Sequence, residues 1–335
     1  MKKKGEYMGN SMLYPSLEEI SIAYHSSYQY KKKVDEVRII SRAERLSKLI
    51  IEYEIVFHTK RSRNQVDHVF LKIYENKTDA EKSYQMNHHL WVNGFQSANY
   101  SIARPLHYFK SYQAIMTEKM RGEAMLSYIM SSNNTKILES IFRVAYFLTK
   151  LHQLSCPIIS SNFANRSKSN LENFYHDLMA FTPGQRTDIE YIYNMLLHHS
   201  EDINNNSTTF LHGDFHLDNI FVNEGQVTVI DFDDHFRGDC AWDVAYFFAQ
   251  IHVRSYLIFG DFDHFNDIAD CFLNAYLLFN PQEDPSSFHK RLAFYSSRSL
   301  FEFLYYEICI LKKKEPTLLQ DFIQQCQRYI NEKKN

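Results

Sequence analysis

The sequence has 335 residues, 44% of them apolar, which is enough to bury a substantial core in one large domain or two lobes. Its 37 basic and 40 acidic residues give a formal net charge of -3, which argues against a function that depends on a whole-molecule field for nucleic acid or an anionic membrane. The five cysteines are scattered without a CxxC pair, which argues against a disulfide framework or a zinc site and indicates core thiols in a reducing compartment.

The opening residues, MKKKGEYMGNSMLYP, are basic but have no apolar stretch behind them, so they do not have the pattern of a signal peptide. No later apolar run is long enough to span a bilayer. We therefore expect a cytoplasmic protein that begins with a flexible tail at residues 1–14.

A small lobe with a sheet is predicted over residues 15–120. The segment PSLEEISIAY predicts a short helix, with Ser16 as its N-cap and Glu19 three residues later in a capping-box spacing. Residues 34–74 contain three runs rich in β-branched and aromatic residues, separated by polar segments. Three antiparallel strands are the simplest interpretation.

The following segments complete this lobe and begin a larger one. Residues 78–95 predict a helix stopped by Gly94, and residues 113–124 predict a strand that ends in a turn at Gly122. Apolar residues then recur at three- and four-residue spacing, which predicts helices over residues 137–154, 188–199, 243–251, 268–279 and 292–311. The polar segments 160–170 and 200–209 are expected to be surface loops. The predicted fold class is α+β, with a small antiparallel-sheet lobe at 15–120 and a mostly helical lobe at 121–335.

A strand-forming stretch, FLHGDFHLDNIFVNEGQVTVIDFDD, interrupts the helices at residues 210–234. Two apolar runs flank NEGQ, which predicts a hairpin with Gly225 at its turn and with Asn219 and Asp231 at its open ends. Asp214 lies five residues before Asn219, so three oxygen-bearing side chains are expected to converge. Such oxygens suit Mg²⁺, and a bound cation would offset the cost of burying the carboxylates.

The motif HGDFHLDN, followed by VIDFDD and GDCAWDVA, resembles the signature of the aminoglycoside phosphotransferase and choline kinase group, the small-molecule branch of the protein-kinase fold. The resemblance implies a two-lobed kinase-like fold with Asp214 as the catalytic base and with Asn219 and Asp231 as Mg²⁺ ligands. Asp233, expected on a strand and pointing the same way as Asp231, would support the metal site or bind a second metal ion. Asp243 would brace the catalytic loop.

Two histidines lie within the same motif. We expect His212 to be a packing and hydrogen-bonding residue of the catalytic loop and not a base. His216 either lines the substrate side or is a satisfied loop histidine. His152, in a Leu-His pair that the family also carries at the end of a helix, is expected to be structural.

The resemblance also implies nucleotide-binding residues in the small lobe. Lys72, in VFLKIY, would hold the α- and β-phosphates of ATP or GTP. Glu81 on the following helix would hold Lys72, although Glu75 is also near and Glu81 has the alternative interpretation of a solvated surface residue. The backbone from Glu118 to Met120 would hydrogen-bond adenine, with Met116 behind it.

The sequence departs from the kinase pattern between the first two predicted strands. Kinases carry a glycine-rich cover for the phosphates there, whereas this chain has SRAERLSKL without a glycine. Arg42, together with Ser41 and Arg45, is expected to contact the phosphates by side chain instead.

The phosphate acceptor is expected to be a small hydroxylated molecule. Gly213 stands where protein kinases keep an arginine, and only eleven residues separate Asp231 from Asp243, which leaves no room for an activation segment. A cationic acceptor would suit the carboxylates Asp261, Asp263, Asp267, Glu302 and Glu307, and a quaternary amine would suit a cage of Tyr246, Phe247, Phe301, Tyr305 and Tyr306. The simpler interpretations are a solvated helix face and a packed core.

Three functions are compatible with these motifs. A phosphotransferase that uses ATP or GTP with Mg²⁺ is favoured by the set Lys72, Asp214, Asn219 and Asp231. Its acceptor would be an aminoglycoside, amino-alcohol or sugar-like hydroxyl, and no nucleic-acid or membrane partner is expected. The missing glycines favour a catalytically inactive kinase-fold module that binds a nucleotide or a partner. The His and Asp of HGDFH also permit a metal-dependent phosphoesterase. The sequence does not predict the oligomeric state.

Overall fold

The computed structural model describes residues 13–45, 48–155, 163–202, 209–313 and 316–331. Most of the tail expected at residues 1–14, and most of the loop expected at 200–209, lie outside the described residues. The chain divides into two compact units: a first unit up to Gly122 that includes Thr228–Asp233, and a second unit of Glu123–Val227 and Asp234 onward. The first unit therefore contains a short piece of the strand-forming stretch at 210–234.

Helix α1 (Leu17–Ser27) opens the first unit. The Ser16 hydroxyl accepts a hydrogen bond from the backbone N–H of Glu19 at 3.2 Å, and the Glu19 carboxylate accepts one from the backbone N–H of Ser16 at 2.8 Å. This is the predicted capping box. Ile20 and Tyr24, four residues apart, are fully buried on one face of the helix.

An antiparallel sheet follows in the order β1-β2-β3-β6-β5. Its strands are β1 (Lys33–Arg45), β2 (Lys48–His58), β3 (Gln65–Tyr74), β5 (Pro105–Phe109) and β6 (Ala114–Glu118). The three strands predicted over 34–74 are confirmed as antiparallel neighbours, and the strand predicted over 113–124 is β6. Strand β5 and the short β4 (Tyr100–Ile102) are additional. Strand β4 is too short to give a β-pattern in the sequence, and β5 begins with Pro105, a residue that argues against a strand.

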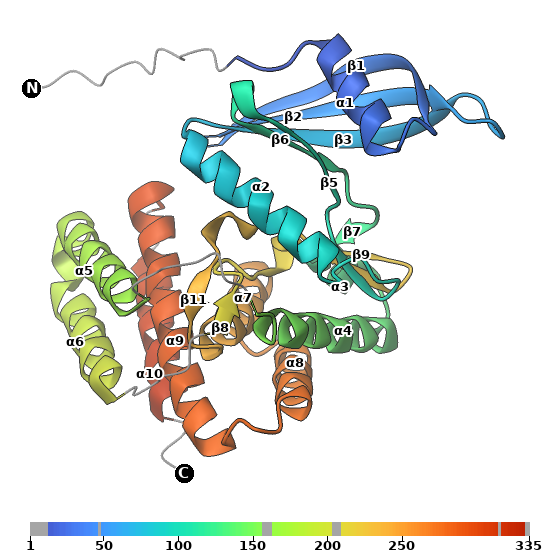
Figure 1. Cartoon of the computed structure of the whole chain (residues 1–335). Helices are drawn as coiled ribbons and strands as arrows, with labels where there is room; N and C mark the ends of the chain where they lie inside the picture. The colour runs from blue at the N-terminus through green and yellow to red at the C-terminus, as the bar shows by residue number, and fades with distance from the viewer. Residues whose placement is uncertain (1–12, 46–47, 156–162, 203–208, 314–315, 332–335) are drawn as a thin grey trace, which may run out of the picture. The chain divides into compact units, whose positions relative to one another are not determined.

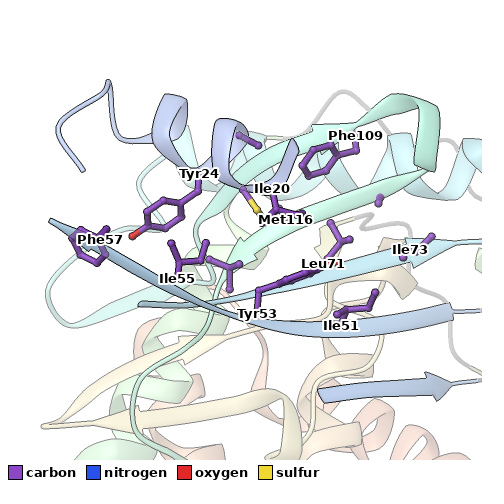
Figure 2. Packing of buried hydrophobic residues seen from close by; sticks show 13 residues of the cluster. Ile20, Tyr24, Ile51, Tyr53, Ile55, Phe57, Leu71, Ile73, Phe109 and Met116 are labelled. Carbon is purple, nitrogen blue, oxygen red and sulfur yellow. The ribbon is translucent and has the colours of Figure 1, made fainter. Parts of the chain in front are cut away.

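The sheet has two faces, because successive side chains on a strand point in opposite directions. The α1 face is a buried apolar core below that helix, and it includes Ile51, Tyr53, Ile55, Leu71 and Met116 (Figure 2). Truncating Ile51, Ile55, Leu71 or Met116 to alanine would lower the free energy of unfolding by about 2–5 kcal/mol. The alternate positions, Ile50, Phe70, Lys72, Ile115 and Thr117, form the opposite face.

Helix α2 (Lys77–Val92) begins at its N-cap Asn76, whose side-chain oxygen accepts from the N–H of Thr78 at 2.8 Å. The helix ends before Gly94, which has a φ of +101°, as the sequence predicts. It packs on β3, β5 and β6. The buried residues at its sheet-facing side recur at helical spacing and are Ala80, Ser83, Met86 and Leu90.

The second unit is mostly helical (Figure 1). Its helices are α3 (Met125–Ser131), α4 (Asn134–His152), α5 (Phe163–Phe181), α6 (Arg186–Asp202), α7 (Ala241–Phe259), α8 (Asn266–Phe279), α9 (Pro285–Tyr305) and α10 (Pro316–Asn331). Helix α7 packs on α9, α4 on α8, and α10 on α9, while α5 and α6 lie side by side. None of the helices in the described residues combines the length and the hydrophobicity that a membrane span requires.

Short strands connect these helices. They are β7 (Glu123–Ala124), β8 (Thr209–Leu211), β9 (Ile220–Asn223), β10 (Gln226–Val229) and β11 (Phe236–Gly238). Strands β9 and β10 are neighbours, and Glu224 and Gly225 between them both have positive φ. The hairpin predicted around NEGQ is therefore confirmed.

The helical part agrees with the sequence except at one predicted loop. The helices predicted over 137–154, 188–199, 243–251, 268–279 and 292–311 correspond to α4, α6, α7, α8 and α9. The loop predicted over 160–170 is wrong from Phe163 onward, because α5 begins there. The polar first half of α5 carries no periodic signal in the sequence. Its second half does contain buried apolar residues, namely Leu171, Phe174 and Leu178. The observed fold class is α+β, as predicted.

Candidate active site

The first unit contains a pocket of about 260 Å³ on the opposite face of the sheet. Its walls are partly apolar and partly charged, and they include Ile50, Phe70, Ile115, Met120, Lys72, Asp231 and Asp233. An apolar slot with a few convergent polar groups is typical of a small-ligand site.

Lys72 on β3 lies at the charged end of this pocket. Its Nζ is 2.7 Å from Oδ1 of Asp231 and 2.5 Å from Oδ2 of Asp233. Burial alone would lower the pKa of Lys72, but the adjacent carboxylates of Asp231 and Asp233 and the Tyr74 hydroxyl outweigh it and raise the pKa. Lys72 is therefore a fixed cation, as its predicted phosphate-binding role requires.

The backbone at Asp231 differs from the expectation. Strand β10 ends at Val229, Asp231 has a φ of +64°, and Phe232–Asp234 form a 3₁₀ turn. The expectation that Asp231 and Asp233 lie on one strand is therefore wrong. The left-handed conformation is costly for a residue with a Cβ, and it turns the chain so that both carboxylates reach Lys72.

Asp233 is held on every side by donors of the first unit. Its Oδ2 contacts Nζ of Lys72 and of Lys48, the latter at 2.6 Å. Its Oδ1 accepts from the Tyr74 hydroxyl at 2.9 Å and from the Ser83 hydroxyl at 2.7 Å. Burial alone would raise the pKa of Asp233, but the two ammonium groups lower it well below its usual range. With both oxygens engaged, Asp233 does not fit the predicted role of a direct metal ligand.

The predicted pairing of Glu81 with Lys72 is wrong. Glu81 is exposed, and Lys72 pairs with the two aspartates instead. Ala80 and Ser83 define the buried side of α2, and Glu81 is one residue from Ala80, a rotation of about 100° away from that side. Helix α2 contributes Ser83 to the site, through its hydrogen bond to Asp233.

The expected adenine contacts stay a prediction. Met120 lines the pocket, and no described residue hydrogen-bonds its backbone N–H. The backbone N–H groups of Glu118 and Lys119, by contrast, already donate to the carbonyl oxygens of Arg104 at 3.0 Å and His68 at 2.9 Å. The expectation that Met116 lies behind the adenine is wrong, because Met116 belongs to the core of the α1 face (Figure 2). Its strand neighbours Ile115 and Thr117 line the pocket.

Arg42 is also placed differently from the expectation. It is exposed and stacks on Tyr14 at 4.9 Å. In the ladder it lies opposite Ile51, so it belongs to the α1 face and not to the pocket. Ser41 lies 3.5 Å from Glu52, and the side chain of Arg45 is outside the described part of the chain. The residue that the sequence analysis missed is Lys48, which shares the face of Ile50 and Lys72 because it is an even number of residues away from Ile50 on β2.

The second unit holds Asp214 and Asn219. The amide nitrogen of Asn219 donates to the Asp214 backbone oxygen at 3.0 Å and to its Oδ2 at 3.3 Å, and it lies 3.1 Å from Nε2 of His216. His216 Nε2 is itself 3.3 Å from Asp214 Oδ2. His216 is thus bound to the catalytic loop, and the alternative of a satisfied loop histidine is the one observed.

Asp214 is a stable anion. Burial alone would raise its pKa, but hydrogen bonding to His216, the charges of His216 and His212, and a hydrogen bond from Tyr246 together lower the pKa to about 2. Its side chain remains 33% exposed. A carboxylate held in this way is suited to orienting a hydroxyl group.

Asp243 braces this loop from the first turn of α7, as the resemblance implies. It is completely buried and accepts from the backbone N–H groups of His212 at 2.7 Å and Gly213 at 2.9 Å. His152 at the end of α4 lies 3.1 Å from the same carboxylate, which explains its structural role. His212 is buried, and its Nδ1 accepts from the N–H of Asp214 at 3.3 Å, so it is a packing and hydrogen-bonding residue.

Gly213 is required by geometry. Its φ is +86°, and a Cβ built there would lie 2.2 Å from the backbone oxygen of Asp234. The backbone after β8 therefore passes directly against the segment that leads to β11, and only glycine permits this approach.

The structure limits the candidate acceptor contacts. Phe247 and Phe301 are buried, in agreement with the simpler interpretation of a packed core, so these two side chains are not available to a quaternary amine. Three of the candidate carboxylates have cationic partners: Asp263 with Arg328, Glu302 with Arg298 and Glu307 with Lys313. Tyr246, in contrast, interacts with both Asp214 and Glu302. Among the candidates, Tyr246 is therefore the one bonded to Asp214.

Comparison with known proteins agrees with these motifs. The sequence profile of the phosphotransferase enzyme family (APH) matches residues 55–267, more than half of the chain. No curated protein matches the chain significantly.

Several solved structures are similar to most of the chain. A thermostable mutant of aminoglycoside phosphotransferase APH(4)-Ia, in a ternary complex with AMP-PNP and hygromycin B, is 13% identical with a TM-score of 0.58, over 93% of this chain and 97% of that chain. The streptomycin-ATP-APH(2'')-IIa ternary complex is 13% identical with a TM-score of 0.54, over 94% and 97%. Choline kinase from Cryptosporidium parvum Iowa II is 11% identical with a TM-score of 0.57, over 88% and 89%. The chain has the fold of these kinases, and it belongs to the phosphotransferase enzyme family.

Proposed function

We propose that the protein transfers the γ-phosphate of ATP, or of GTP, to a hydroxyl group of a small molecule. Family membership supports the reaction class. The observation that carries the proposal is Lys72, a fixed cation that pairs with Asp231 in an apolar-walled pocket of the first unit. Similar solved structures contain AMP-PNP, ATP or GDP.

The pocket supports a specific placement of the nucleotide. Ile50, Phe70 and Ile115 offer apolar surface for a purine ring, and the backbone N–H of Met120 is a donor for it. Lys72 then contacts the phosphates. Of the nucleotide-binding residues expected from the sequence, Lys72 and Met120 are retained in this proposal.

The residues proposed to hold Mg²⁺ are Asp231 and Asn219. Asp231 is 39% exposed and uses only Oδ1 on Lys72. The side chain of Asn219 makes its contacts through nitrogen, and no described residue hydrogen-bonds its amide oxygen. Both therefore offer an oxygen of the type that Mg²⁺ prefers, and one or two such ligands are usual when phosphates complete the coordination. When bound, Mg²⁺ neutralises charge on the phosphates. The described residues contain no group of three or more His, Cys, Asp or Glu arranged to hold a metal ion.

Asp214 is proposed as the catalytic base. With a pKa of about 2 it is ionised at neutral pH and accepts the hydrogen bond of an acceptor hydroxyl. It then takes the proton as the acceptor oxygen bonds to the γ-phosphorus, while the bond from that phosphorus to the β,γ-bridging oxygen breaks and ADP or GDP leaves. Such a weak base contributes mainly by orienting the nucleophile, and this suits phosphoryl transfer, in which positioning and charge stabilisation dominate.

The proposed acceptors are aminoglycosides, amino-alcohols and sugar-like molecules. Tyr246 marks the acceptor side of the site in this proposal, because its side chain is hydrogen-bonded to Asp214. Similar structures bind streptomycin, gentamicin or hygromycin B.

The test is a transfer assay with the purified chain, Mg²⁺ and ATP or GTP over panels of these three acceptor classes, with the phosphorylated product detected by mass. We expect one class to gain a phosphoryl group with the wild type and none with Asp214→Asn. Binding of nucleotide without transfer to any acceptor would favour the inactive module. Hydrolysis of phosphate esters without nucleotide would favour the phosphoesterase.

A further inference from the structure

Two lysines of the first unit converge on one carboxylate. Lys48 is the first residue of β2, and Lys72 lies on the adjacent β3, where Ile50 and Lys72 are direct partners in the ladder. Their Nζ atoms lie 2.6 Å and 2.5 Å from the same oxygen, Oδ2 of Asp233. The two ammonium groups are therefore held close together on the side of the sheet that lines the pocket.

Asp233 is fixed more firmly than an ordinary ion-pair partner. Its side chain is only 10% exposed, and its Oδ1 accepts from hydroxyl groups of Tyr74 on β3 and Ser83 on α2. Two strands and a helix thus anchor one carboxylate. This carboxylate does what the sequence analysis assigned to Glu81, namely to hold the phosphate-binding lysine.

The arrangement leaves donor capacity on Lys48. A lysine ammonium has three N–H donors. Lys72 uses two of them on Asp231 and Asp233, whereas Lys48 has one carboxylate partner. Lys48 is also 28% exposed, so its remaining donors can reach a ligand. The charges of Lys48, Lys72, Asp231 and Asp233 balance. Mg²⁺ held at Asp231, as proposed above, would give this cluster an excess of positive charge, which a polyphosphate would neutralise.

The position of Lys48 in the chain matters as well. It follows the connection between β1 and β2, which has no glycine that would let backbone amides approach phosphates closely. A lysine at the first residue of β2 supplies a cation from the same segment. Arg42 lies on the α1 face of the sheet and therefore does not supply a cation to the pocket.

We propose that Lys48 is a second phosphate-binding lysine and that Asp233 is a positioning residue that holds Lys48 and Lys72 together for the nucleotide phosphates. This rests on the proposed function, since it presumes that a nucleoside triphosphate occupies the pocket. It assigns to side chains the phosphate cover that other kinases build from a glycine-rich backbone.

The test compares the binding of adenosine, ADP and ATP with Mg²⁺ to the wild type and to Lys48→Met by calorimetry, with thermal melting as a second readout. We expect the Kd for ATP and ADP to rise about 10- to 100-fold in Lys48→Met, because charged hydrogen bonds to phosphate are lost, and the Kd for adenosine to stay within about twofold. Lys48→Arg keeps the charge and should retain more ATP affinity than Lys48→Met.

Lys32→Met is the matched control. Lys32 also pairs with an aspartate, Asp67, and its side chain is 23% exposed, but it lies among Tyr24, Tyr28 and Phe57 of the α1 face. The Lys32→Met variant loses a lysine–aspartate pair but leaves the pocket unchanged, so its affinity for ATP should equal that of the wild type. Asp233→Asn should weaken ATP binding and spare adenosine.

Two results would overturn the inference while leaving the proposed function intact: Lys48→Met binding Mg-ATP as tightly as the wild type, or losing adenosine affinity to the same extent as ATP affinity. A wild type that binds no Mg-nucleotide would overturn the proposed function itself and this inference with it.

Discussion

Asp214 combines features that orient a hydroxyl group without making the carboxylate a strong base. It is one-third exposed, and its backbone and side chain are held by Asn219, His216 and His212. Asp233 shows the opposite arrangement, with little exposure and both oxygens engaged. The two carboxylates are therefore suited to different roles: Asp214 to the proposed contact with an acceptor hydroxyl, and Asp233 to holding the protein's own lysines.

Replacing Asp214 by Asn removes the proton acceptor and keeps the size of the side chain. We expect transfer to fall by about 10²–10⁴-fold, the usual contribution of a general base, with nucleotide binding unchanged because the pocket lies in the first unit. Steady-state kinetics together with a nucleotide titration check this. Asp218→Asn is the control, since Asp218 belongs to the same loop but pairs with Arg254 at the surface. Unchanged turnover in Asp214→Asn would refute the assignment of the base.

The depressed pKa of Asp214 also has a consequence for stability. Because the folded pKa of about 2 lies below the ordinary value of 3.8, ionised Asp214 favours the folded state; this contribution is present above about pH 4 and is lost as the pH falls toward 2. The wild type's unfolding free energy relative to Asp214→Asn should therefore be constant from about pH 7 to about pH 5 and decrease below about pH 4. Urea unfolding at a series of pH values measures this. A decrease already complete near pH 6 would contradict the low pKa.

At the scale of elements, the catalytic loop depends on a close backbone contact. Gly213 follows β8 and passes the chain segment before β11, and Asp243 at the start of α7 binds the loop amides. Helix α4 contributes His152 to the same carboxylate. The loop geometry is thus a product of several elements that the sequence brings together from positions far apart.

Gly213→Ala tests this contact. The new Cβ would meet the backbone oxygen of Asp234 and would require an unfavourable positive φ, so we expect a loss of at least about 1–3 kcal/mol in stability and a fall in transfer as the loop moves. Gly184→Ala is the control, because nothing lies within 4 Å of a Cβ there, and it should change stability by no more than about 0.5 kcal/mol. Equal melting temperatures for the two variants would contradict the argument.

The elements themselves were largely predictable, whereas the faces of the strands were not. Period-two and helical patterns, the capping box at Ser16 and the turn at Gly225 identify the main sheet, most helices and the hairpin. Arg42 was misplaced because its face depends on the ladder, in which register shifts in β1 set its partner. Glu81 was misplaced because a shift of one residue on a helix changes the side it occupies.

The sequence also could not indicate how Asp233 is used. The VIDFDD motif predicts acidic residues near Lys72, but the positive φ of Asp231 and the turn after it decide which atoms meet. Lys48 carried a weak signal, since a lysine in an otherwise apolar strand start needs a partner. That partner, Asp233, is 185 residues away in the chain. Only the tertiary structure of the first unit connects them.

At the scale of the whole molecule, the first unit is not a simple N-terminal half. It takes Thr228–Asp233 from the later part of the chain, and these residues supply Asp231 and Asp233 to the pocket. Residues 1–122 alone would leave Lys48 and Lys72 without their carboxylates. Nucleotide binding is therefore expected to be a property of the complete chain.

The most direct measurement is the thermal stability of the full chain with Mg²⁺, with ATP or GTP, and with both together, in the wild type and in Asp231→Ala. We predict a rise in melting temperature only when metal and nucleotide are both present, corresponding to about 2.7 kcal/mol when the ligand is at 100 times its Kd, and its loss in Asp231→Ala. No rise with either nucleotide plus Mg²⁺, or the same rise in Asp231→Ala, would contradict the proposed metal-nucleotide site.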